Sequence, residues 1–207
     1  MIAIIDYGVG NLFSLSCSFA FLGQEVTVTS DPDEIRRADR LILPGVGAFE
    51  DAARKLRESG LDRVVLEEAA AGKPLLGICL GMQMLFEKSY EYGEHKGLGL
   101  IKGEVRPMQG VIPNDLKIPH IGWNALNLTA PEHSLFRYVK EGDCVYFVHS
   151  FYGADCDGEL IATTEYGVPL TAAVASGNVM GTQFHPEKSG EVGLNILKAF
   201  CEIEGKK

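Results

Sequence analysis

KPLLGICLGMQ, residues 73–83, contains the turn around which the rest of the chain can be arranged. Its first part, Lys73–Ile78, is an apolar run of strand length, and Met82–Lys88 has the composition of a helix. Glycines on both sides of Cys79 let the backbone turn sharply between the two elements. In a nucleophile elbow a serine occupies such a turn, and here a cysteine takes its place. The segment therefore predicts an α/β fold that holds Cys79 at the end of a strand.

Strands and helices alternate in the sequence before this turn. Runs suited to strands occur at Met1–Asp6, Glu25–Thr29 and Arg40–Leu43. Helical patterns follow at Leu12–Leu22, after the capping residues Ser30–Glu34, at Ala48–Ser59 and at Leu61–Ala71. Regular alternation of this kind predicts a mostly parallel sheet with helices on both faces.

Beyond Gly97 the strand-like runs are shorter and turn residues separate them. They cover residues 143–148, 160–164, 170–175 and 179–184. Ser176-Gly177-Asn178 is a hairpin signal, and Glu191–Glu204 has the pattern of a closing amphipathic helix. Without repeats or linkers, residues 1–207 are predicted to form one α/β domain. Its mostly parallel central sheet is flanked by helices and has an antiparallel extension.

The overall composition argues against several classes of function. Of the 207 residues, 46% are hydrophobic and 23% charged, as in ordinary folded domains. A formal net charge of −9 without basic clusters argues against a nucleic-acid partner. We find neither a signal peptide nor an apolar stretch of membrane-spanning length, and therefore expect a cytoplasmic protein without a membrane partner.

The cysteines, histidines and glycines give no sign of a bound metal or cofactor. Five widely spaced cysteines, an odd number without CxxC pairs, suggest reduced thiols. The five histidines share no metal-ligand spacing. Gly8 and Gly10 are followed by Phe13 where a dinucleotide-binding motif needs a third glycine. We expect neither a metal nor a cofactor.

A second segment, GTQFHPE at residues 181–187, supplies what a cysteine nucleophile needs. His185 and Glu187 are two residues apart, so in an extended segment their side chains share one side. A nucleophile of this kind requires a histidine that takes and returns its proton, and a third group that orients the imidazole. By itself such a pair is more often a strand cap and a solvated carboxylate. Its occurrence together with Cys79 favours a Cys-His-Glu triad.

Both segments resemble one enzyme family. GICLGMQ and FHPEKS are similar to class I glutamine amidotransferases. DYGVGNL at Asp6–Leu12, PGVGAFE at Pro44–Glu50 and KIPHIGWN at Lys117–Asn124 resemble, within that family, the glutaminase subunits of imidazole glycerol phosphate synthases. The similarity spans nearly the whole chain.

The resemblance implies a reaction and a partner. Such subunits hydrolyse L-glutamine to glutamate and ammonia through a thioester on the catalytic cysteine. The partner is a (β/α)8-barrel cyclase, which receives the ammonia through a channel and forms imidazole glycerol phosphate and the purine precursor AICAR in histidine biosynthesis. We therefore expect a heterodimer.

The resemblance also assigns roles to individual residues. The catalytic residues would be Cys79, His185 and Glu187, and the oxyanion would be held by the amides of Val46 and Leu80, with a peptide flip at Gly45–Val46. The implied substrate-binding residues are Gly47, Gln83, His149, Ser150 and Phe151. Many relatives have tyrosine at position 151, so no hydroxyl contact is expected there. The implied partner-interface residues are Asn11, Trp123, Tyr146 and Lys188, with Trp123 expected in a loop.

Two other functions compete with this interpretation. The chain could be the glutaminase of another synthase, such as the one that makes pyridoxal phosphate, which shares the triad but not the HIGWN segment. It could also be a catalytically silent subunit that only regulates a synthase. The intact Cys79, His185 and Glu187 argue against a silent subunit.

Overall fold

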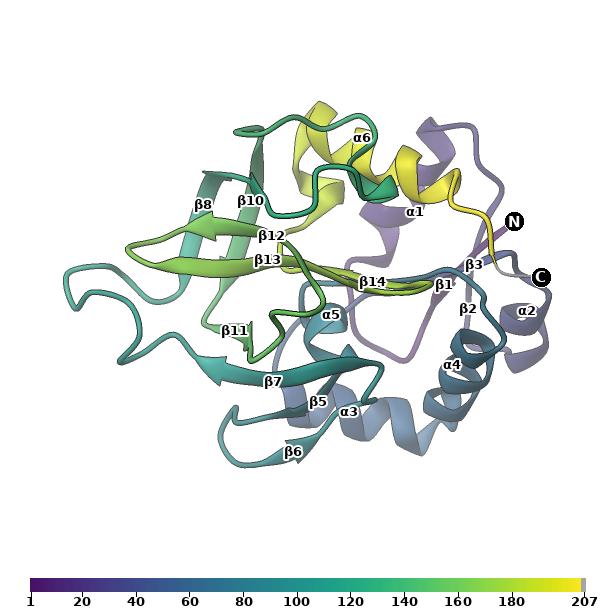
Figure 1. The fold of residues 1–207 in the computed structure, drawn as a ribbon. Coiled ribbons are helices and arrows are strands. Elements are labelled where there is room, and N and C mark those ends of the chain that lie inside the picture. Colours follow the sequence, from purple (N-terminus) through teal and green to yellow (C-terminus); the bar gives the residue numbers. More distant parts are fainter. Residues whose placement is uncertain (206–207) are drawn as a thin grey trace.

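An eight-stranded sheet runs through the centre of the molecule (Figure 1). The computed structural model describes residues 1–205. The strand order is β2-β1-β3-β4-β14-β13-β12-β9. Parallel pairing joins β2 (Val26–Thr29), β1 (Ile2–Ile5), β3 (Arg40–Leu43), β4 (Leu75–Ile78) and β14 (Val179–Thr182). Antiparallel pairing adds β13 (Pro169–Ser176), β12 (Leu160–Glu165) and β9 (Asn127–Leu128). The predicted sheet with its antiparallel extension is confirmed.

Helices cover both faces of this sheet (Figure 1). One face carries α1 (Leu12–Phe21) and α6 (Gly190–Cys201), and the other carries α2 (Pro32–Arg37), α3 (Phe49–Glu58), α4 (Leu61–Ala70) and α5 (Leu80–Leu85). Successive residues of a strand pack on opposite faces of the sheet, since their side chains point in opposite directions. In β1, Ile2 and Ile4 pack with α1 and α6, whereas Ala3 and Ile5 pack with the other helices.

Two smaller sheets accompany the central sheet. One has the order β11 (Phe151–Ala154), β7 (Ile101–Pro107), β5 (Phe86–Ser89) and β6 (His95–Lys96). The other pairs β8 (His120–Ala125) with β10 (Cys144–His149). Two 3₁₀ turns, η1 (Ser134–Phe136) and η2 (Pro186–Lys188), complete the chain.

Several boundaries differ from the sequence-based expectations. The helix predicted over Met82–Lys88 starts earlier and ends at Leu85, because Phe86–Ser89 pairs as β5 with β6 and β7. Trp123 lies in β8 rather than in a loop. The closing helix ends at Cys201. The last central strand ends at Thr182, so that Gln183 and Phe184 lie beyond it.

Two further findings concern the described residues 1–205. None of their helices is long and apolar enough to cross a membrane. All five cysteines fall within this range and are free thiols, with Cys17 and Cys144 exposed.

Candidate active site

Cys79 occupies a strained turn between β4 and α5. Its backbone has φ 54° and ψ −111°, a left-handed conformation that costs a non-glycine residue about 1–3 kcal/mol. The Cys79 amide donates to Thr182 O at 2.7 Å, which ties the turn to β14. The Cys79 carbonyl accepts from Gln83 N at 3.1 Å and starts the helix. The sharp turn predicted from the flanking glycines is confirmed.

Glycines allow a second loop to pack directly on this turn. A Cβ added to Gly81 would lie 1.9 Å from Leu43 O, and one added to Gly45 would lie 2.6 Å from Gly81 N. No side chain fits at either position. The Pro44–Gly47 loop is therefore held beside the first turn of α5, with the Tyr7 hydroxyl donating to Pro44 O at 2.6 Å.

His185 and Glu187 form a buried pair shortly after the end of β14. His185 Nδ1 lies 2.9 Å from Glu187 Oε1, and the two side chains are 3% and 1% exposed. Burial alone would lower the pKa of His185, but hydrogen bonding to Cys79 and to Glu187 raises it to about 9. The extended segment expected here is wrong, because Glu187 lies in η2. The tight turn still brings the carboxylate back to the imidazole.

The buried side chain of Ser189 fixes the position of this turn. Its hydroxyl donates to His185 O at 2.6 Å and accepts from Tyr146 N at 2.9 Å. His185 N in turn donates to Tyr146 O at 3.0 Å. The histidine is thus anchored to β10 through its own backbone.

A cleft of about 410 Å³ lies where these segments meet. Cys79 and His185 line it, and so do the two expected oxyanion residues and all five expected substrate residues. Those seven are Val46, Leu80, Gly47, Gln83, His149, Ser150 and Phe151. The structure therefore brings together from distant parts of the sequence every residue assigned to the chemistry, with Glu187 directly behind His185.

The carbonyl of Phe151 is held from two sides at the wall of the cleft. It accepts a hydrogen bond from Gln83 Nε2 at 3.1 Å, and His149 Nδ1 lies 2.8 Å away. His149 Nε2 lies 3.1 Å from His120 Nδ1 on the opposite strand. Burial lowers the pKa of His149 to about 4, so its imidazole is uncharged at neutral pH.

Of the four expected interface residues, only Lys188 is among the residues that line the cleft. Trp123 is 55% exposed and pairs directly across the strands with Tyr146, their ring centroids 6.1 Å apart. Lys188 is exposed and lines the cleft. Asn11 starts α1, next to Gly10, whose position packs against Pro44. Ile121, 59% exposed beside Trp123, adds apolar surface to this end of the molecule.

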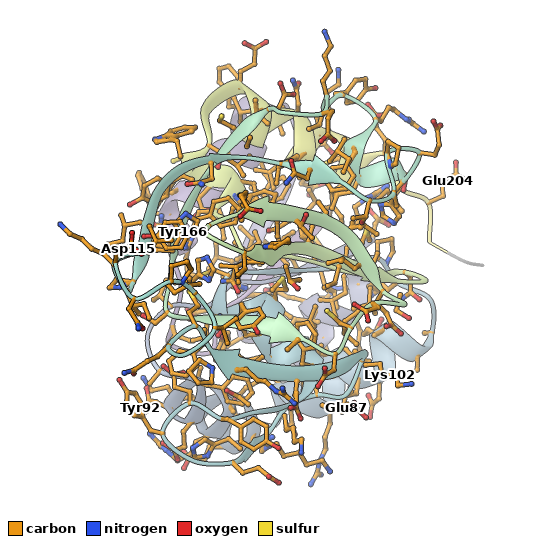
Figure 2. The ribbon with its side chains drawn as sticks, turned by 60° about the vertical axis from the view of Figure 1, so that its left-hand side comes forward. Glu87, Tyr92, Lys102, Asp115, Tyr166 and Glu204 are labelled. Atoms are coloured by element: carbon orange, nitrogen blue, oxygen red, sulfur yellow. The ribbon has the colours of Figure 1, made fainter. Side chains whose placement is uncertain are left out.

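The structure also places at the site residues that the sequence did not indicate. Glu91 and Tyr92 line the cleft, and the Glu91 carboxylate accepts from Phe49 N at 2.6 Å, the start of α3. Tyr92 is 89% exposed and lies at the edge of the molecule (Figure 2). Gln183 contacts the Cys79 sulfur at 3.8 Å. Its place two residues before His185 was the one available signal.

Within residues 1–205 no group of three histidine, cysteine or acidic side chains is arranged to hold a metal ion.

Comparison with known proteins agrees with this geometry. The family described as Glutamine amidotransferase class-I matches residues 3–203. The imidazole glycerol phosphate synthase subunit HisH of Lactococcus lactis is 55% identical, over 97% of this chain and 98% of its own. The HisH subunit of Sulfurimonas denitrificans is 50% identical over the full length of both chains. A solved glutamine amidotransferase structure superposes with a TM-score of 0.74 at 20% identity, covering 97% of this chain and 100% of that one.

Proposed function

Because the chain belongs to the class I glutamine amidotransferase family, and within it to the HisH subunits of imidazole glycerol phosphate synthase, we propose that Cys79, His185 and Glu187 hydrolyse L-glutamine. The observation that carries this assignment is the meeting of three groups in one cleft. They are a cysteine on a strained turn, a histidine paired with a buried carboxylate, and the loop containing Val46. Residues 1–207 act as one glutamine amidotransferase domain.

The proposed reaction has two halves. The Cys79 thiolate attacks the side-chain carbonyl carbon of glutamine, and the amides of Val46 and Leu80 receive the negative charge that forms on the oxygen. The His185 imidazolium gives its proton to the leaving nitrogen, so that ammonia departs and a thioester remains. His185 then takes a proton from water, which attacks the thioester and releases glutamate and the cysteine thiolate.

The charge on His185 fits its task in the first half. A pKa of about 9 keeps the imidazole protonated at neutral pH, ready to donate to the leaving nitrogen. Glu187 accepts from Nδ1 and thereby directs the other ring nitrogen away from itself. Gln83, His149, Ser150 and Phe151 line the same cleft and would hold the amino acid end of the substrate.

The proposed partner is the (β/α)8-barrel cyclase subunit of the same synthase, and the proposed setting is the cytoplasm. The relatives from Lactococcus lactis and Sulfurimonas denitrificans are named as subunits of that enzyme. The exposed apolar side chains of Trp123 and Ile121 on β8 offer a surface of the kind that a protein partner covers. Ammonia would pass from the cleft into the barrel rather than into solvent.

The decisive experiment measures glutamate release from glutamine by the purified chain, alone and with the cyclase subunit and its phosphoribosyl ligand. We expect strong release only in the mixture, and its loss in Cys79→Ala. If the synthase subunit that makes pyridoxal phosphate activated glutamate release and the cyclase did not, the chain would be the glutaminase of that synthase. No release with saturating partner and ligand would support a silent regulatory subunit.

A further inference from the structure

The side chain of Gln183 contacts both Cys79, the proposed nucleophile, and Gln83, one of the proposed substrate-binding residues. Its Nε2 lies 3.8 Å from Cys79 Sγ as a donor, and its Oε1 accepts from Gln83 Nε2 at 3.0 Å. Gln183 is fully buried, and its backbone amide donates to Ala172 O at 2.8 Å. A completely buried amide with two such partners is set in one position.

The hydrogen-bond partners determine which way both amides point. Gln83 Nε2 donates to two acceptors, Phe151 O and Gln183 Oε1, and an amide nitrogen carries two hydrogens. Gln183 must therefore turn its oxygen toward Gln83, which leaves its NH₂ group facing the sulfur. For the same reason Gln83 has only its own oxygen left to offer a ligand in the cleft.

The sulfur has contacts suited to each of its ionisation states. Val148 O lies 4.0 Å from Cys79 Sγ and accepts a hydrogen from the neutral thiol. The Gln183 NH₂ group donates, and a donor interacts more strongly with an anionic acceptor than with a neutral one. Burial strengthens this preference further. Gln183 thus favours the ionised sulfur, in addition to His185.

We propose that Gln183 stabilises the Cys79 thiolate and, through the same amide, orients Gln83 toward the substrate. This inference rests on the proposed glutamine hydrolysis and adds a residue to it. Without the Gln183 amide the Cys79 thiolate is less stable and Gln83 is no longer held in position. Both effects occur in the same variant, so kcat falls and KM for glutamine rises. A buried amide with a packing role alone would affect stability without changing the reactivity of Cys79.

The test measures the rate of Cys79 alkylation by iodoacetamide against pH, in the full chain. The modified Cys79 peptide is quantified by mass spectrometry, because the exposed Cys17 and Cys144 also react. Gln183→Met keeps the length of the side chain and removes both hydrogen bonds. Gln183→Glu can still accept from Gln83 but places a negative charge beside the sulfur. Thermal unfolding curves establish that each variant is folded.

We expect Cys79 alkylation below its pH midpoint to slow roughly tenfold in Gln183→Met, the effect of one hydrogen bond to a charged group, and further in Gln183→Glu. Thr164→Val is the matched control. Thr164 is also fully buried, in β12, and its hydroxyl donates to Ala125 O at 2.9 Å rather than to the Cys79 turn, so its profile should equal that of the wild type.

A wild-type alkylation profile in the folded Gln183 variants would overturn the inference. If Gln183→Met does not fold, the profile of Gln183→Glu decides, since that variant retains the acceptor for Gln83. Failure of the wild type to hydrolyse glutamine with its partner is a separate result. It would contradict the proposed function, whereas the alkylation profiles report on the Gln183–Cys79 contact in either case.

Discussion

His185 Nδ1 lies 2.9 Å from Glu187 Oε1, and the other oxygen of that carboxylate, Oε2, has no hydrogen-bond partner. Among residues 1–205 it is the one buried side-chain polar atom left in this state. Leaving a buried acceptor unpaired costs about 1–3 kcal/mol. The carboxylate therefore depends on the imidazolium of His185 to offset its burial, and the two side chains act as a unit.

Replacing the charged carboxylate of Glu187 with a neutral amide tests the role of Glu187. We expect Glu187→Gln to lower kcat for glutamine hydrolysis by roughly 10²–10⁴-fold, because the protonated His185 loses its counter-charge and its fixed orientation. Steady-state kinetics in the presence of the cyclase measure the effect. Glu202→Gln is the control, since Glu202 pairs with Arg137 at the surface and should leave kcat unchanged. Equal activity of both variants would remove Glu187 from the triad.

The raised pKa of His185 also predicts how stability depends on pH. The pKa rises from an ordinary value of 6.5 to about 9 on folding. The folded state therefore gains stability from the proton below pH 6.5 and loses it as the pH rises through about 9. We expect the free energy of unfolding to fall between neutral pH and about pH 10. The fall should be smaller in Cys79→Ala, which lacks one partner of the imidazolium. Denaturant titrations across this range measure it, and parallel curves for the two proteins would argue against the Cys79–His185 interaction.

Gly81 is expected to be among the least replaceable residues of the site. In Gly81→Ala the new Cβ would lie 1.9 Å from Leu43 O, so the turn at Cys79 or the end of β3 must move. We expect a loss of at least about 1–3 kcal/mol of stability, the range for overpacking in a closed core, together with loss of glutaminase activity. The control Gly158→Ala meets no atom within 4 Å and should stay within about 0.5 kcal/mol of the wild type. Denaturant unfolding compares the two, and similar values for both would show that the turn tolerates a side chain.

Trp123 is expected to contribute directly to binding of the partner. An aromatic side chain that is 55% exposed on β8 has the character of an interface anchor. We expect Trp123→Ala to weaken cyclase binding by roughly tenfold or more, as measured by calorimetry, while the free chain remains folded. Phe21→Ala removes an aromatic that is 78% exposed at the opposite end of α1 from Asn11, and should bind normally. If Phe21→Ala weakened cyclase binding more than Trp123→Ala, the interface would lie on the face that contains Phe21.

The sequence was sufficient for the central sheet and for the turn at Cys79 because both depend on local patterns. Apolar runs of four to six residues and flanking glycines are visible in the chain itself. Phe86 shows where this fails. The composition of its segment is helical. The segment is nevertheless a strand, β5, because it pairs with β6 and β7 and because the Phe86 ring packs over Gly153. Such distant pairing overrides local propensity.

In the candidate site, too, the residues that stand in local motifs were predictable and those placed by long-range contacts were not. Cys79 and His185 stand in motifs, whereas the contacts of Gln183 link positions about a hundred residues apart and have no local pattern. Glu91 likewise reaches the cleft only because its loop folds back on the start of α3.

The most direct measurement of the central assignment is a search for the acylated enzyme. The chain, its cyclase partner and glutamine are mixed, quenched in acid during turnover and digested, and the peptides are examined by mass spectrometry. We predict a glutamyl adduct on the Cys79 peptide alone, and no glutamate release from Cys79→Ala. Turnover with no adduct on Cys79, or an active Cys79→Ala variant, would contradict the assignment of Cys79 as the nucleophile.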